Sequence, residues 1–273
     1  NANPRTHQPI LAVEPLRHAV LRLDPTAGTF TSTHLLFLRM CMSAGAYSET
    51  LPVTQKAIHS FASSDKETGA LDGRPLCADF PSSYFFLTYG NGLTYTITNV
   101  EVYEYFLLAG MACIALEHYE MALLHLEHVI TAPAQNTAHV HMVEAYQKWV
   151  LLSCLVHGTC SLTLKSASAS ALKTMKGYAK PYESLAESFA RAGSEKLIAE
   201  YEVGLERWHN DGNLGLVQQL VAHHSRFWIK NLQKTFSTIA VEQVASELNK
   251  TSEETTQYLE TLINQRQINA TIE

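Results

Sequence analysis

The sequence lacks the features that mark several large classes of protein. No run of apolar residues reaches the roughly 18–20 positions that a membrane-spanning helix needs. Its start shows neither a signal peptide, with charges followed by an apolar segment, nor an arginine-rich targeting helix. The five cysteines are scattered and form no C-x-x-C pair, which is typical of reduced thiols in the cytosol or nucleus. We therefore expect a protein of the nucleus and cytoplasm that is not attached to a membrane.

Positive charge is also in short supply. The 20 lysines and arginines face 26 aspartates and glutamates, so the 273-residue chain carries a formal net charge of -6. Proteins that bind nucleic acids usually have a basic excess, because neutralising phosphates supplies most of their affinity. The charge balance therefore argues against a dedicated nucleic-acid binder.

Catalytic signatures are absent too. The sequence holds no P-loop, no G-x-S-x-G and no H-E-x-x-H. One histidine pair, His139-x-His141, resembles the zinc-binding pair of a class of deubiquitinating proteases. That class also needs a serine and an aspartate downstream, where this chain has Trp149 and Leu152. Residues two apart on a helix also point in different directions, so we predict that this pair is not a zinc site.

A second group of histidines lies on one predicted helix. His125 and His128 are three residues apart, and His118 lies two turns earlier, so two of them could share a metal ion. No third ligand follows at a matching spacing. We predict no catalytic residue, no metal and no other cofactor. The alternative hypothesis is an enzyme with a cryptic metal site at these three histidines.

Most of the chain has a helical period. The stretch Thr33–Phe61 predicts two helices joined near Ala44-Gly45, with Pro52 in the first turn of the second helix. Residues Ser63–Asn99 break this pattern with a polar, turn-rich segment. Aromatic and β-branched residues around Gly90-Asn91-Gly92 then predict a β-hairpin. We interpret 63–99 as an insertion in a mainly α-helical protein.

Helices resume with a pair that is similar to a tetratricopeptide repeat. Thr98 and Glu101 form a capping box, and the small residues Gly110 and Ala122 would let two antiparallel helices touch. A further long helix is predicted over Thr137–Gly158. Such pairs stack into a right-handed solenoid, whose usual role is to hold other proteins.

Between Glu144 and Glu183 the chain has five lysines and no acidic residue. This composition leaves two interpretations open, a solvated connector or a docking patch for an acidic partner. The candidate contact residues of such a patch are Lys165, Lys173, Lys176 and Lys180. After a turn at Asp211-Gly212-Asn213, a strongly amphipathic helix begins at Leu214. Two shorter helices are predicted before that turn, over 182–191 and 194–210.

From Thr235 onward the sequence has the order strand, helix, turn, helix, strand of a winged helix. Val241, Val244, Ala245 and Leu248 give the first helix an apolar face, and Thr251 with Glu254 forms a capping box before the second. The alternation of Ile268, Ala270 and Ile272 predicts a half-buried strand.

The second helix is the one that would read DNA. It carries Glu253, Glu254 and Glu260 against a single basic residue, Arg266, and its acidic first turn would repel phosphates. We therefore predict no specific DNA binding. Because an edge strand is a natural docking site, we expect protein partners to bind at Val241, Val244, Leu248, Ile268, Ala270 and Ile272.

Five stretches occur in a suggestive order: MALLHLEHVITAPA, MVEAYQKWVLLSCLVHG, GYAKPYESLAESF, DGNLGLVQQLV and NLQKTFSTIAVEQVASEL. With the layout of helical repeats followed by a winged helix, they resemble PCI-domain proteins, and among these the subunit 3 family of the COP-9 signalosome, in a fungal form. The resemblance runs from Val102 to the end and more weakly through Ser32–Phe61. It implies a chain truncated at both ends, without the first repeats and the C-terminal helix of that family.

This resemblance implies a helical-repeat region at 1–160, with its insertion at 63–99, and a PCI domain at 161–273. The PCI domain would have a helical part at 161–234 and a winged-helix part at 235–273. The implied function is a non-catalytic scaffold in the complex that deneddylates cullins and so regulates cullin-RING ubiquitin ligases. The partners would be other PCI subunits, joined through winged-helix edges in a hetero-oligomer. The alternative is a scaffold of the proteasome lid or of a translation initiation factor complex.

Overall fold

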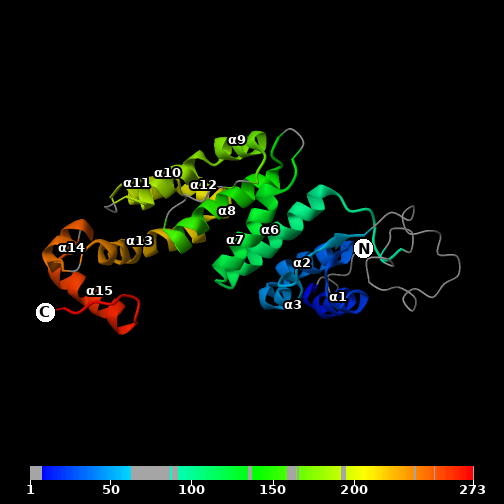
Figure 1. Cartoon of the computed structure of the whole chain (residues 1–273), viewed down its shortest axis with the longest axis horizontal. Coiled ribbons are helices and arrows are strands. Elements are labelled where there is room, and N and C mark those ends of the chain that lie inside the picture. Colours follow the sequence, from blue (N-terminus) through cyan, green and yellow to red (C-terminus); the bar gives the residue numbers. More distant parts are fainter. Residues whose placement is uncertain are drawn as a thin grey trace. The chain divides into compact units, whose positions relative to one another are not determined.

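The computed structural model describes residues 8–62, 87, 92–134, 137–158, 164, 166–191, 195–236, 238–248 and 250–272. The chain is mainly helical (Figure 1) and divides into two compact units. Unit 1 holds Asn1–Pro133 and His139–Ala145, and unit 2 holds Ala134–Ala138 and Tyr146–Glu273. The resemblance to PCI proteins implies a boundary between two regions at residue 160. The division between units 1 and 2 is a different one and falls within a helix. In the part of the chain that the structure describes, no helix is both long and apolar enough to cross a membrane.

The described residues of unit 1 form helices and one small parallel sheet. Its elements are α1 (Ile10–Leu23), β1 (Thr29–Phe30), α2 (Ser32–Ala44), η2 (Tyr47–Thr50), α3 (Leu51–Thr54), β2 (Ser60–Phe61), α6 (Asn99–Ala115) and α7 (Tyr119–Thr131). The strands pair Thr29 with Ser60 and Phe30 with Phe61. The sequence pattern predicts neither α1 nor this sheet, whose strands are too short to show an alternation.

The predicted helix break at Ala44-Gly45 is confirmed. Gly45 takes the left-handed conformation that ends a helix, with φ of 66°. Pro52 lies in the first turn of α3, also as predicted. That second helix is much shorter than predicted, because it ends at Thr54 and the chain up to Phe61 then pairs with β1.

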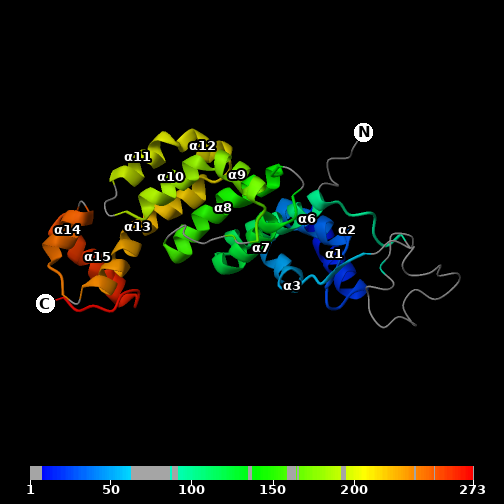
Figure 2. The same ribbon diagram turned by 45° about the horizontal axis from the view of Figure 1, so that its top comes forward.

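The helix pair α6 and α7 forms as predicted. The Thr98 side chain accepts from the Glu101 amide while the Glu101 carboxylate accepts from the Thr98 amide, which completes the capping box. A β-carbon at Gly110 would lie 3.0 Å from the Leu126 side chain. The absence of a side chain at this glycine therefore allows the two helices to approach closely. They lie side by side in both views (Figure 1 and Figure 2).

The predicted β-hairpin falls largely outside the described residues, since only residue 87 and residues from Gly92 onward are described there. Residues 92–98 contain no strand. Thr94 instead ties this segment to α2, since its hydroxyl accepts from the Ser32 amide at 3.0 Å.

Most of unit 2 runs from Tyr146, within α8 (Val140–His157), to Glu273. Its further helices are α9 (Ala169–Tyr178), α10 (Lys180–Phe189), α11 (Glu195–Val203), α12 (Leu205–Asn210), α13 (Leu214–Thr235), α14 (Val241–Leu248) and α15 (Ser252–Asn264). One interpretation of the lysine-containing segment is a solvated connector. In the structure, part of this segment is the helix α9, which buries Ala171 and Met175. The helix predicted over 194–210 is two helices, because Gly204 interrupts it and the Trp208 indole occupies the space beside that glycine.

A buried polar network joins three segments of unit 2. Lys148 on α8 donates to the Asn213 side-chain oxygen at 2.8 Å, and the Asn213 amide nitrogen donates to the Tyr182 hydroxyl at 2.9 Å. That hydroxyl donates to Asp211 at 2.7 Å. The turn before α13 is therefore anchored to α8 and α10 by side-chain hydrogen bonds rather than by apolar contact alone.

The two helices of the predicted winged helix form, but its strands do not. Of the residues before α14, those described at 238–240 take no strand conformation, and residues 269–272 after α15 have no regular structure. A strand needs a hydrogen-bonded neighbour, and the described residues of this region provide none. The predicted strand at Ile268–Ile272 is therefore corrected to an irregular segment.

Candidate protein-interaction site

A small apolar core holds the C-terminal helices together. Ile229 of α13 packs with residues of α14 and α15 and with Ile268. Val244, Leu248 and Ile268 are only 3%, 5% and 5% exposed. These three predicted partner-binding side chains are therefore used inside the fold.

The other predicted contact residues of this region are more accessible. Val241 is half-buried at the start of α14, while Ala270 and Ile272 are exposed beyond α15. The alternation that suggested a half-buried strand is not reproduced, because Ile272 is exposed although Ile268 is buried. The accessible part of the predicted partner-binding set is thus Ala270 and Ile272, with Val241 at its margin.

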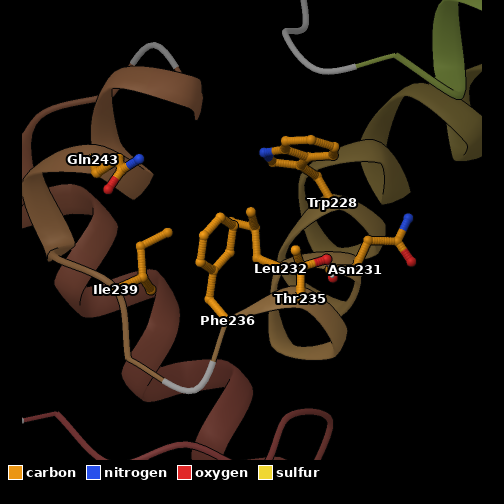
Figure 3. A pocket seen from close by; sticks show the side chains of 7 residues that line it. All are labelled: Trp228, Asn231, Leu232, Thr235, Phe236, Ile239 and Gln243. Carbon is orange, nitrogen blue, oxygen red and sulfur yellow. Dashed lines mark hydrogen bonds between the residues drawn. The ribbon is translucent and has the colours of Figure 1, made fainter.

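A cleft of about 230 Å³ lies between the end of α13 and the start of α14. Four of its lining side chains are apolar or aromatic, and three are polar: Trp228, Leu232, Phe236 and Ile239, with Asn231, Thr235 and Gln243. Phe236 is 47% exposed. Figure 3 shows the Trp228 indole nitrogen turned across the gap toward the helix that carries Gln243, and that nitrogen is shielded from solvent without a hydrogen-bond partner among the described residues.

Sequence reasoning misses this cleft. The sequence pattern places Trp228 and Leu232 only on the apolar face of a helix, and it does not single out Phe236. A large aromatic residue at the point where an amphipathic helix ends is the signal that could direct attention to it. The depth of the cleft depends on how α14 turns back against α13. The hydrophobic periodicity of the sequence holds no information about that arrangement.

The first turn of α15 is acidic and exposed. Thr251 and Glu254 form the predicted capping box, so the glutamate stabilises its own helix end. Lys250 lies over the Tyr258 ring at 4.5 Å from its centroid. The exposed Glu253 and Glu254 present negative charge where a DNA-reading helix would need the opposite sign.

Three of the four predicted docking lysines lie on the outside of α9 and α10. Lys173, Lys176 and Lys180 are exposed, whereas Lys165 lies outside the described residues. The other lysine of this segment, Lys148, is 5% exposed and belongs to the buried network. The structure thus separates one internal lysine from a group that faces solvent.

The histidines do not assemble a metal centre in the described residues, where no group of three or more potential ligands comes together. His125 is 6% exposed, both its ring nitrogens lack a partner, and burial lowers its pKa to about 4. It lies against Phe106, with ring centroids 6.1 Å apart.

The rings of His139 and His141 are closer than predicted, with centroids 4.9 Å apart. His139 precedes the first residue of α8, so the rule for directions on a helix does not apply to it. Burial, and then the neighbouring His141, lower the pKa of His139. Trp149 and Leu152, where the protease class has ligands, are buried core residues.

The described cysteines Cys41, Cys113 and Cys154 are buried and are not joined in disulfides. Burial raises the pKa of the Cys41 thiol and of the Cys113 thiol to about 11. Since the thiolate is the nucleophilic form, these two residues are inert core residues at neutral pH.

Antiparallel helix pairs packed against each other, such as α6 and α7, are the structural unit of helical-repeat proteins, and the fold places this chain in that class. The model of the family "COP9 signalosome complex subunit 3, N-terminal helical repeats" matches residues 3–171, which is more than half of the chain. The chain belongs to this family.

Three curated relatives bear the same name, COP9 signalosome complex subunit 3. The protein of Emericella nidulans is 33% identical over 273 residues, covering 99% of this chain and 54% of its own length. The Neurospora crassa protein is 28% identical over 236 residues, or 86% and 47% of the two chains. The Dictyostelium discoideum protein is 25% identical over 267 residues, or 97% and 57%. The chain thus spans about half the length of the curated relatives it matches.

Proposed function

We propose that this chain is a non-catalytic scaffold subunit of a COP9 signalosome, acting in the nucleus and cytoplasm. The observation that carries the proposal is the family match over residues 3–171, which covers the helix pairs of unit 1 and reaches into α9. In this proposal the complex deneddylates cullins and so regulates cullin-RING ubiquitin ligases. The chain contributes positions for other subunits rather than reacting groups.

The contacts with neighbouring PCI subunits are proposed to lie at the C-terminal end of unit 2. The segment after α15 exposes Ala270 and Ile272 and has no regular structure. Such a segment can gain a strand conformation by pairing with the edge of a partner's sheet, where main-chain hydrogen bonds supply the affinity. The buried Ile268 would hold the start of that strand against α15.

The test is affinity purification of the tagged chain from a native lysate of its source, followed by identification of the bound proteins. We expect several PCI-domain proteins of one signalosome. Ala270→Pro removes a backbone N–H from the proposed strand and should reduce the recovery of at least one neighbouring subunit. Ser252→Pro is the matched control, because proline is well tolerated at the first position of a helix and Ser252 is the first residue of α15.

Recovery of proteasome-lid or initiation-factor subunits instead would replace the signalosome by one of those complexes. Recovery of no PCI protein would refute the scaffold proposal. Equal recovery with Ala270→Pro and Ser252→Pro would leave the scaffold role in place but remove this segment from the interface.

A further inference from the structure

We propose that the outer face of α9 and the start of α10 form a docking site for a short acidic segment of a partner protein. The site consists of Lys173, Lys176 and Lys180, called the lysine stripe below. The proposal rests on the charge and geometry of this surface, and it holds whether or not the chain is a signalosome subunit.

The stripe lies opposite the buried face of its helix. Ala171, Met175 and Ala179 are completely buried and attach this part of the chain to unit 2. Ala179 separates α9 from α10 with backbone angles outside the helical region, φ of -93° and ψ of 9°, and Lys180 is the first residue of α10. At about 100° per residue, Lys173 and Lys176 lie about 60° apart on the side of α9 away from Ala171 and Met175, and Lys180 is exposed at the start of α10.

The surroundings leave the positive charge of the stripe uncompensated. Among the described residues, the ion pairs within 4.0 Å involve Arg17, His18, Arg39 and Lys196, and no lysine of the stripe. The segment between Glu144 and Glu183 carries five lysines and no acid, so the net charge of -6 for the whole chain leaves -11 for the rest. The stripe is a local positive patch on an acidic protein.

Helix stability accounts for only part of this arrangement. A cation near the end of a helix is favoured by the helix dipole, and Lys176 lies in the last turn of α9. Lys180 is the first residue of α10, where the same dipole disfavours a cation. Because Lys180 also directly follows the C-terminal cap of α9, where the dipole favours a cation, the two helix ends offset each other and helix dipoles do not account for this lysine.

The dimensions favour a short peptide over an extended polyanion. Lys180 comes seven residues after Lys173, which corresponds to roughly 10 Å at the helical rise per residue. An extended peptide with acidic side chains at alternate positions places two carboxylates about 7 Å apart, so a few residues can reach the whole stripe. A nucleic acid carries a charge every ~1.7 Å along its axis and would run on over the acidic remainder of the chain. An acidic polypeptide segment is therefore the proposed occupant.

The test is a fluorescence-anisotropy titration of the whole chain with a labelled Asp-Glu-Asp-Glu-Asp-Glu peptide. The Asn/Gln peptide of the same length is the neutral control probe. We expect Lys173→Glu with Lys176→Glu to weaken binding about tenfold or more, and binding to weaken as salt rises from about 50 to about 200 mM. The matched double variant Lys234→Glu with Lys250→Glu changes the net charge equally at exposed positions outside the stripe, and should change the affinity less than about twofold.

Replacing the same two lysines by glutamine, with the thermal midpoint measured alongside, separates lost binding from lost folding. The double glutamine variant should bind the acidic peptide more weakly while its thermal midpoint stays unchanged. The proposal is overturned if the acidic peptide does not bind at ~1 mM, or if both double glutamate variants weaken it equally. It is also overturned if a single-stranded oligonucleotide or phosphatidylserine vesicles bind through the stripe more tightly than the peptide does.

Discussion

Two residues other than glycine adopt the left-handed conformation directly after a helix, which is unusual for a side chain with a β-carbon. Glu117 has φ of 59° after α6, and Arg266 has φ of 55° after α15. At Glu117 the following amide, of His118, donates back to the Cys113 carbonyl at 2.9 Å, as in a helix-ending motif where glycine is usual. The turn between the paired helices is thus held by hydrogen bonds despite a strained residue.

Relieving that strain should stabilise the chain. We expect Glu117→Gly to raise the free energy of unfolding by about 0.5–1 kcal/mol, because glycine adopts positive φ without a steric cost. Glu120→Gly is the control, since Glu120 is exposed in the first turn of α7 and glycine should cost about 1 kcal/mol there. Denaturant unfolding measures both, and a loss of stability from Glu117→Gly would contradict the strain argument.

Gly158 is constrained both by its backbone and by a neighbour. Its φ is 77°, and a β-carbon there would overlap the ring of Phe227 on α13. Gly158→Ala should therefore destabilise the chain by about 1–3 kcal/mol beyond the backbone cost, seen as a lower thermal midpoint. Gly212→Ala isolates the backbone cost of about 1 kcal/mol, because Gly212 has φ of 66° and a β-carbon there would meet no atom within 4 Å.

The Phe227→Ala background checks the cause. If the overlap is what destabilises Gly158→Ala, the added cost of that substitution should shrink when the ring is removed. An unchanged cost would mean that the backbone alone is responsible.

At the scale of elements, three of the five stretches that carry the family resemblance meet in one place. MVEAYQKWVLLSCLVHG supplies Lys148, GYAKPYESLAESF supplies Tyr182, and DGNLGLVQQLV supplies Asp211 and Asn213. These four residues form the buried network of unit 2. A buried polar group is costly unless its partners are in place, so the network couples the identities of residues that lie far apart in the sequence.

This coupling predicts a specific loss. Tyr182→Phe removes a hydroxyl that donates to Asp211 and accepts from Asn213, and should cost about 1–3 kcal/mol of unfolding free energy. Tyr178→Phe is the matched control, because Tyr178 is 67% exposed and should change stability by less than about 0.5 kcal/mol. Equal effects in chemical denaturation would show that the network contributes nothing.

Elements with caps and a long helical period could be predicted from the sequence. The capping boxes at Thr98 and Thr251 and the glycine at 45 give local signals, because the groups they satisfy lie within a few residues. The β1–β2 pairing could not be predicted, because it joins two residues to two others some thirty positions away. The predicted strand at Ile268–Ile272 is wrong for a related reason, since its alternation describes a candidate strand but not the partner that would make it one.

At the scale of the whole molecule, buried histidines link stability to pH. His34 and His125 are buried, and desolvation lowers the pKa of each to about 4. In the unfolded chain both should titrate near 6.5. As the pH falls from about 6.5 toward 4, the unfolded state takes up protons that the folded state refuses, so each histidine should remove up to about 3 kcal/mol of stability.

We therefore expect the denaturant midpoint to be nearly flat above about pH 7.5 and to fall steadily between about pH 6.5 and 4. His125→Leu should flatten part of this slope and raise stability at neutral pH, since both ring nitrogens of His125 are buried without a partner. If the denaturant midpoint of His125→Leu changes with pH as steeply as that of the unmodified chain, the pH dependence comes from other groups.

The sequence by itself determined the helical class, the capped helix starts at Thr98 and Thr251, the helix end at Gly45 and the family, because caps, period and the order of stretches are properties of residues close along the chain. It also indicated acidic charge at the head of α15. Only the tertiary structure decided which apolar side chains of the C-terminal helices are internal and where the cleft beside Trp228 opens. It also decided which lysines face solvent. Burial and exposure depend on contacts between segments that are distant in the sequence. The hydrophobic period shows which residues share one face of a helix, but it does not show what packs against that face.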